Sequence, residues 1–93
     1  MSKFRIFETD EFSKKLNKLT SKDSKFILSK LKEYVYPQLK DEPAYGKNVK
    51  KLRGYNPETW RYRIGEFRLF YSIDYKEKII FILTIDRRKD VYK

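Results

Sequence analysis

The sequence predicts a single α+β domain, residues 1–93, in which a two-helix N-terminal hairpin packs on one face of a small antiparallel sheet. The expected element order is β-α-α-β-β-β. Two observations carry this prediction. Apolar residues recur every three or four positions in the N-terminal half, as in amphipathic helices, and every second position after residue 57, as in strands.

The N-terminal half begins with a short strand at Phe4–Phe7. Thr9-Asp10 then offers an N-cap for a helix that runs to about Leu19, and Thr20–Asp23 matches a capping box that opens a second helix. Pro37 should end or kink this second helix, because proline has no backbone N–H and its ring clashes with the preceding turn. The apolar stripe of the second helix consists of Ile27, Leu28, Leu31, Tyr34 and Val35.

The C-terminal half begins after a segment, residues 41–57, that holds two of the three prolines and two of the three glycines and is therefore predicted to be mainly loop. Residues 60–64 and 66–73 alternate in polarity, and Gly65-Glu66 between them suits a two-residue hairpin turn. A second turn at Tyr75–Glu77 leads to Ile79–Ile85, which is apolar on both faces as in a central strand.

The composition excludes several classes of protein. Without cysteine there is neither a disulfide framework nor a thiolate metal site, and without histidine the commonest metal ligand and general base are missing. The acids show no metal-like spacing, so we expect no metal and no cofactor. No apolar run approaches the roughly 20 residues that span a bilayer, and Met1–Asp10 has no signal-peptide core. We therefore expect a cytoplasmic protein without a membrane partner.

The charge favours a polyanionic ligand. The chain has 23 basic and 13 acidic residues, a formal net charge of +10. A lysine-rich surface alone is a simpler reading, but six of the seven arginines follow residue 50 while most lysines precede it. Arginine's planar fork suits phosphate, whereas lysine commonly only solvates a helix face. The sequence thus predicts binding to nucleic acid, above all RNA.

The predicted hairpin gathers arginines on one face of the sheet. Arg61 and Arg63 share a face, and a Gly65-Glu66 turn puts Arg63 directly opposite Arg68. Like charges facing each other across strands are destabilising, so this arrangement suggests an anion site. The alternative is that these side chains extend into solvent or pair with the nearby acids Glu66, Asp86 and Asp90.

Two further segments have both a functional and a structural reading. Lys51–Gly54 either cradles a phosphate or is a basic loop around one buried leucine. Tyr92, in the charged segment after the last strand, either stacks on a base, donates a proton or pins the chain end to the core. Trp60 and the other strand aromatics are expected in the core.

Taken in order, these motifs resemble the RelE branch of the RelE/ParE toxin superfamily. The resemblance rests on Lys51–Gly54, Trp60–Arg63, Gly65–Tyr71 and Arg87–Tyr92, and the two-helix N-terminal half also fits that fold. It implies a ribosome-dependent mRNA endoribonuclease paired with an antitoxin. In that family a ribose 2′-hydroxyl attacks the adjacent phosphorus without a metal, which leaves a 2′,3′-cyclic phosphate and a free 5′-hydroxyl.

The resemblance also implies roles for individual residues. The family's two sheet lysines fall on Arg61 and Arg63, its sheet arginine on Arg68, its late arginine on Arg88 and its terminal tyrosine on Tyr92. Arg63 and Arg68 are assigned to the phosphate in its transition state, Arg88 to the leaving 5′-oxygen, and Tyr92 to base stacking or proton transfer. The residues expected to bind RNA around them are Lys51, Arg53, Arg61, Arg87 and Lys89.

The resemblance leaves the general base open, because arginine stays protonated where the family has lysine. The ribosome, Tyr92 or an acid such as Glu66 are candidates. Two other functions compete with the nuclease: a ParE-like protein that inhibits DNA gyrase, and a module that binds RNA or the ribosome without cutting. The expected partners of the nuclease are mRNA, the ribosomal A site and a cognate antitoxin whose acidic segment covers the basic face.

Overall fold

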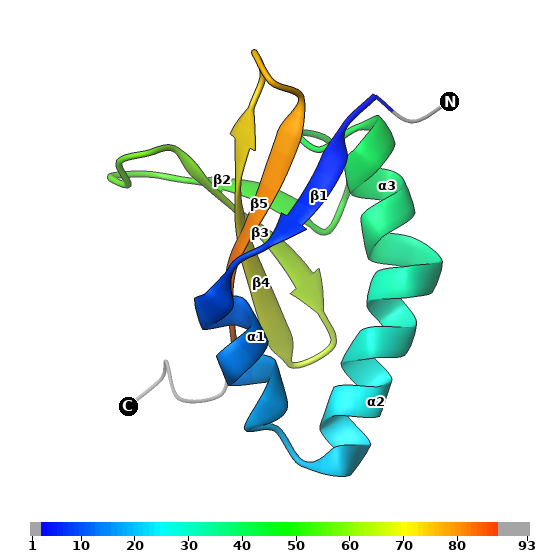
Figure 1. Ribbon diagram of the computed structural model, residues 1–93. Helices are drawn as coiled ribbons and strands as arrows, with labels where there is room; N and C mark the ends of the chain where they lie inside the picture. The colour runs from blue at the N-terminus through cyan, green and yellow to red at the C-terminus, as the bar shows by residue number, and fades with distance from the viewer. Residues whose placement is uncertain (1–2, 88–93) are drawn as a thin grey trace.

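The computed structural model describes residues 3–87, which form a five-stranded sheet with the helices on one side (Figure 1). The strand order in space is β1-β5-β4-β3-β2. The predicted α+β class, with two N-terminal helices on one face of a sheet, is confirmed. The elements are β1 (Arg5–Glu8), α1 (Asp10–Asn17), α2 (Ser21–Lys30), η1 (Leu31–Val35), α3 (Tyr36–Asp41), β2 (Val49–Leu52), β3 (Thr59–Ile64), β4 (Phe67–Asp74) and β5 (Ile79–Arg87).

The sheet differs from the prediction in two respects. The segment predicted to be mainly loop contains β2, which pairs antiparallel with β3. The first strand, β1, pairs parallel with β5, so the sheet is mixed although its other pairs are antiparallel. β2 is a short edge strand with two lysines at its centre. Lysines on an edge strand disfavour pairing with another chain. They also lower the strand propensity of the segment, which is why the sequence did not indicate a strand here.

Pro37 does not end the second helix. The helical path continues from α2 through η1 to the end of α3, with Pro37 in the first turn of α3. η1 is a π-helical turn, in which the Tyr36 N–H bonds to the Leu31 carbonyl oxygen. This wider turn accommodates the proline, whose ring would clash with a regular preceding turn. Both predicted caps are confirmed, since the Thr9 hydroxyl accepts from the Phe12 N–H and the Thr20 hydroxyl from the Asp23 N–H.

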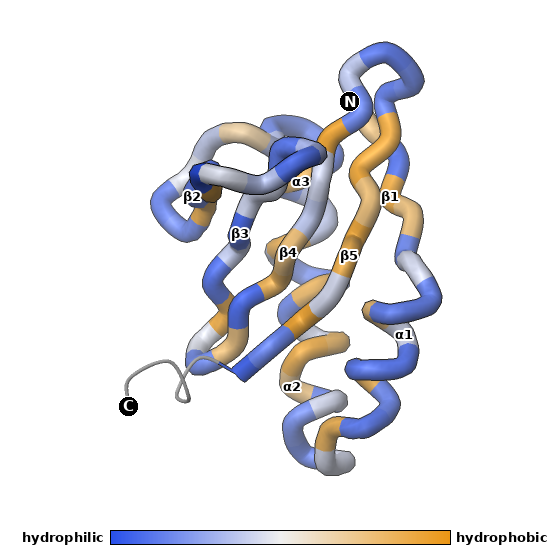
Figure 2. Tube along the Cα trace, turned by 90° about the vertical axis from the view of Figure 1, so that its left-hand side faces the viewer, coloured by the Kyte–Doolittle hydropathy of each residue, from blue (hydrophilic) through white to orange (hydrophobic). Residues whose placement is uncertain are grey.

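The hydrophobic core lies between the helices and one face of the sheet. The Tyr71 ring is fully buried there, and its hydroxyl donates to the Pro43 carbonyl oxygen over 2.6 Å. None of the helices in residues 3–87 has the length and apolar composition of a bilayer-spanning segment. No helix formed by residues 3–87 lies on the other face of the sheet (Figure 2). The buried apolar residues are Phe4, Phe12, Ile27, Leu31, Val35, Leu39, Tyr62, Ile64, Phe67, Leu69, Tyr71, Ile80, Ile82 and Ile85.

Candidate nucleic-acid interface

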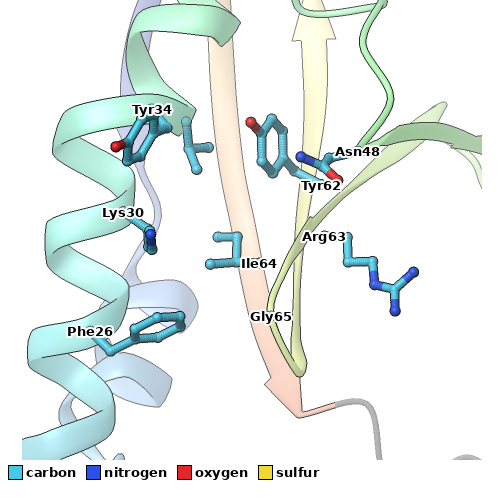
Figure 3. A pocket seen from close by; sticks show the side chains of 9 residues that line it. Phe26, Lys30, Tyr34, Asn48, Tyr62, Arg63, Ile64 and Gly65 are labelled. Atoms are coloured by element: carbon cyan, nitrogen blue, oxygen red, sulfur yellow. The ribbon is translucent and has the colours of Figure 1, made fainter.

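The face of the sheet without helices is basic along β2, β3 and β4. The predicted hairpin register is confirmed, since Arg63 pairs with Arg68 and Ile64 with Phe67. Figure 3 shows Ile64 directed toward α2 and Arg63 directed away from it. Side chains that alternate along paired strands share a face with their cross-strand partners. We call the resulting surface the basic face; it consists of Lys50, Arg61, Arg63 and Arg68.

The acids that might neutralise the arginine pair are bound to other cations. Asp86 lies directly across from Arg68 on β5, but its Oδ1 accepts a hydrogen bond from Lys15 Nζ of α1 at 2.8 Å. Glu66 Oε1 is bonded to Arg87 Nη1 at 2.7 Å. Among residues 3–87, neither Arg63 nor Arg68 forms an ion pair with an acid. Arg63 and Arg68 therefore lie opposite each other on paired strands, and no acid of this part of the chain forms an ion pair with either of them.

Polar atoms beside this pair are also left without partners. In the part of the chain that the structure describes, Arg68 Nε and the Thr84 hydroxyl are buried and have no hydrogen-bond partner. Buried donors are nearly always satisfied, so each exception calls for an explanation. A phosphate that approaches Arg68 would supply the missing acceptor for its Nε–H.

Phe70 belongs to the same surface, although the sequence reading placed the strand aromatics in the core. It is half-buried, pairs across the strands with Arg61, and its ring centroid lies 5.7 Å from Arg68 Cζ. The alternation of side chains along a strand could have identified Phe70, because residues two positions apart, such as 68 and 70, lie on the same face. An aromatic ring among arginines is a natural platform for a nucleobase.

Arg87 lies on the helix side of the sheet and not with the basic face. Its pairing partner is Phe67, whose ring centroid is 4.6 Å from the Arg87 guanidinium. Its Nη2 binds Asp23 Oδ2 at 2.5 Å and its Nη1 binds Glu66, so one side chain ties the start of α2 and the hairpin turn to β5. Arg87 was expected to bind RNA, but in the free protein its guanidinium holds these elements together.

A structural role for Arg87 predicts that Arg87→Gln destabilises the protein by about 1–2 kcal/mol, because two charge-assisted hydrogen bonds and the ring contact are lost together. Urea unfolding followed by circular dichroism measures this difference. Arg5→Gln is the matched control, since it removes one exposed strand arginine from β1 and should change the unfolding free energy by less than about 0.5 kcal/mol. Equal stabilities of the two variants would contradict the assignment.

The Lys51–Gly54 segment lies away from the arginine pair. Lys51 pairs with Trp60 on the side of the sheet opposite the basic face, and its Nζ forms an ion pair with Glu58 at 3.0 Å. Arg53 is exposed in the turn that follows β2. The structure thus brings together Arg61, Arg63 and Arg68 of the sequence-predicted residues, and leaves Lys51 and Arg53 at the edge.

Three predicted site residues, Arg88, Lys89 and Tyr92, lie outside the described residues, as does Asp90. Their roles stay predictions. Across residues 3–87, no group of acids is arranged to hold a metal ion.

Tyr36 and Tyr71 are unsuited to proton transfer at this surface. Burial raises the pKa of Tyr71 above its usual range, and burial together with the Glu8 hydrogen bond does the same for Tyr36. Both hydroxyls are engaged away from the basic face, Tyr71 with Pro43 and Tyr36 with Glu8 at 2.7 Å.

A groove of about 460 Å³ runs between α2–η1 and the edge of β3 (Figure 3). Phe26, Lys30 and Tyr34 line its helix side, with the Lys30 ammonium 5.7 Å and 5.1 Å from the two ring centroids. Ile64 lines the strand side. Arg63 borders this groove and also belongs to the basic face, so the two surfaces adjoin.

The sequence is similar to known toxins over most of its length. The family model for the ParE toxin of the type II toxin–antitoxin system matches residues 6–92. The RelE1 protein of Methanocaldococcus jannaschii is 35% identical over 89% of this chain and 97% of its own length. The toxin RelG of Mycobacterium tuberculosis is 34% identical over 72% of this chain and 75% of its own length.

Solved structures agree with these relatives. The archaeal RelE–RelB complex of Pyrococcus horikoshii contains a chain with a TM-score of 0.70 and 27% identity, covering 94% of this chain and 97% of that one. The RelBE2 toxin–antitoxin complex of Mycobacterium tuberculosis gives a TM-score of 0.71 and 29% identity, with 91% and 98% covered. Sequence, fold and these neighbours agree that the chain belongs to the ParE toxin family of type II toxin–antitoxin systems, and within the RelE/ParE superfamily to the RelE branch.

Proposed function

We propose that this toxin is an endoribonuclease that cleaves mRNA in the ribosomal A site, in the cytoplasm, and so stops translation. The observation that carries the proposal is the opposed pair Arg63–Arg68, neither of which forms an ion pair with an acid among the described residues. A protein keeps like charges face to face at a cost in stability, and a bound phosphate removes that cost.

The proposed chemistry needs no metal ion. A ribose 2′-hydroxyl attacks the neighbouring phosphorus, and negative charge builds on the phosphorane oxygens. Guanidiniums placed beforehand at that position stabilise the transition state more than the ground state, which is how electrostatic catalysis raises a rate. Arg63 and Arg68 take this role, Arg61 binds the neighbouring backbone, and Phe70 offers its ring to a base. Arg88 is assigned to the leaving oxygen, and Lys89 to backbone binding.

The proposal predicts metal-independent cleavage of mRNA on programmed ribosomes. Purified protein should cut in the A site, and cutting should persist when EDTA is added at a level that leaves ribosomes intact. The new ends should be a 2′,3′-cyclic phosphate and a 5′-hydroxyl, both of which enzymatic end-labelling identifies. A supercoiling assay with DNA gyrase, run in parallel, tests the main rival. Gyrase inhibition without RNA cuts would establish the rival, and ribosome binding without cuts would establish the non-cutting module.

The partner is proposed to be a cognate antitoxin that carries an acidic segment. The related RelE of Pyrococcus horikoshii is found in a complex with RelB, and RelBE2 of Mycobacterium tuberculosis is a toxin–antitoxin complex. The net charge of +10 favours an acidic ligand, because complementary charge speeds association. The groove beside Arg63 adds an apolar lining that suits side chains from the same partner.

Binding of this antitoxin should weaken as salt is added. The toxin and the product of the adjacent small open reading frame should copurify, and the logarithm of Kd should rise with the logarithm of the salt concentration, because ion pairs at exposed surfaces are screened. The slope should be smaller for Arg63→Gln than for Arg5→Gln, which removes the same charge from β1. Identical slopes for both variants would place the acidic segment elsewhere.

A further inference from the structure

Asp86 is the carboxylate that the fold places beside the arginine pair. Of the acids in residues 3–87, only Asp86 lies directly across from an arginine of the basic face, namely Arg68. Opposite charges at such positions commonly pair, yet Asp86 bonds to Lys15 of α1. Lys15 holds one carboxylate oxygen of Asp86, while 45% of the side-chain surface stays exposed to solvent.

We propose that Asp86, oriented by Lys15, is the general base that removes the proton from the attacking 2′-hydroxyl. This assignment rests on the proposed nuclease function and supplies the proton acceptor that arginines cannot be. A guanidinium is always protonated in proteins, whereas a carboxylate accepts a proton from a hydroxyl within hydrogen-bond reach. A phosphate bound by Arg68 would bring the neighbouring ribose close to the adjacent strand, where Asp86 stands.

The proton balance of the step is simple. As the bond between the 2′-oxygen and phosphorus forms, the hydroxyl proton passes to the Asp86 carboxylate. The bond between phosphorus and the 5′-oxygen breaks, and that oxygen takes up a proton from water. Asp86 then returns its proton to water, so no net proton is consumed. No electron is transferred and no further reactant is needed.

Lys15 is a positioning residue in this scheme. The hydrogen bond to Asp86 raises the pKa of the Lys15 ammonium above its ordinary value, although partial burial acts in the opposite direction. Lys15 therefore stays cationic and cannot itself be the base. Glu11, on the same helix, adds to the negative potential that keeps it charged. α1 thus contributes to the site by fixing the carboxylate that β5 presents.

Other acids near the hairpin are less suited to the role. Glu66, a candidate from the sequence, is bonded to Arg87 and lies in the turn with 73% of its side chain exposed. Asp23 is bonded to the same arginine, on the helix side of the sheet. Glu58 pairs with Lys51 at the sheet edge. Each is directed to a cation away from the Arg63–Arg68 pair.

The test compares Asp86→Asn with Lys15→Met in single-turnover cleavage of mRNA on programmed ribosomes. Both variants lose the same ion pair, so their melting temperatures should fall by similar amounts. A general base typically contributes about 10²–10⁴-fold to a rate. We expect the cleavage rate of Asp86→Asn to fall at least about 10²-fold. The fall in the rate of Lys15→Met should be at least tenfold smaller. Asp86→Glu keeps a carboxylate and should cut faster than Asp86→Asn, which also covers the case of an unstable asparagine variant.

An mRNA with sulfur in place of the 5′-oxygen at the cut site separates a base from an acid. A thiolate leaves without a proton, so it rescues the loss of an acid but not of a base. The Asp86→Asn defect should therefore persist on this substrate. Three results would each overturn the assignment. They are rescue of Asp86→Asn by sulfur, equal rate losses in Asp86→Asn and Lys15→Met, and an Asp86→Asn variant that cuts at the wild-type rate. If the wild-type protein itself does not cut, the nuclease proposal fails; if it cuts and Asp86→Asn cuts equally well, only the role of Asp86 fails.

Discussion

The variant Arg68→Gln should cut mRNA at least about 10²-fold more slowly than the wild-type toxin and yet be equally or slightly more stable. Removing one donor to a developing oxyanion typically costs about 10²–10³-fold in rate. Stability should not fall, because the change relieves the repulsion between Arg63 and Arg68, worth roughly 0.2–1 kcal/mol. Loss of the contact with the Phe70 ring offsets part of that relief.

Sulfate distinguishes an anion site from an ordinary charged surface. A ligand that binds only the folded protein raises its stability by an amount that depends on its affinity. Sulfate should therefore raise the melting temperature of the wild-type protein more than that of Arg68→Gln. Arg5→Gln is the matched control for general salt effects, because it removes one arginine from the far edge of the same sheet, and it should respond to sulfate as the wild type does.

Thermal melts with and without sulfate, together with the cleavage assay, decide between the two readings of Arg68. If the side chain only solvates the surface, the variant keeps its activity and shows the same sulfate response as the wild type. A destabilised Arg68→Gln protein with full activity would refute the arginine pair as a phosphate site.

The sequence was sufficient for those parts of the fold that depend on local patterns. The two threonine caps, the polarity alternation of β3 and β4, and the two-residue turn each act within a few residues, and together they predicted that Arg63 faces Arg68. Features that depend on long-range contacts were harder to predict from the sequence. Whether β1 pairs parallel or antiparallel with β5 depends on where the helices return the chain. β2 was missed because its four residues, two of them lysines, give a weak strand signal.

The site shows the same division between local and long-range information. Periodicity placed Arg61, Arg63 and Arg68 on one face, but it could not show which acids had other partners. The ion pairs of Arg87 with Asp23 and of Lys15 with Asp86 join residues 64 and 71 positions apart, and no spacing rule reaches that far. These contacts change the reading of both β5 residues: Arg87 becomes a structural tie, and Asp86 becomes a candidate base.

Tyr92→Ala should slow cleavage by about tenfold or more, because stacking on a base is worth roughly 1–3 kcal/mol. Tyr92 lies outside the described residues, but its reach can be bounded from the end of β5. Tyr92 is the fifth residue after Arg87, and an extended chain covers at most about 3.6 Å per residue, roughly 18 Å in all. Arg68 and Phe70 lie on the adjacent strand, which is about 5 Å away. The ring can therefore reach the basic face.

Tyr92→Phe tells which part of the side chain matters, since it keeps the ring and removes only the hydroxyl. If Asp86 takes the proton from the 2′-hydroxyl, the tyrosine hydroxyl is not needed as a base, and Tyr92→Phe should cut nearly as fast as the wild type. Equal losses in the phenylalanine and alanine variants would assign proton transfer to the hydroxyl. Normal cleavage by both variants would mean that Tyr92 only anchors the chain end. Single-turnover rates on programmed ribosomes, with melting temperatures measured for each variant, separate these three outcomes, because an anchoring residue lowers the melting temperature without changing the rate of the folded protein.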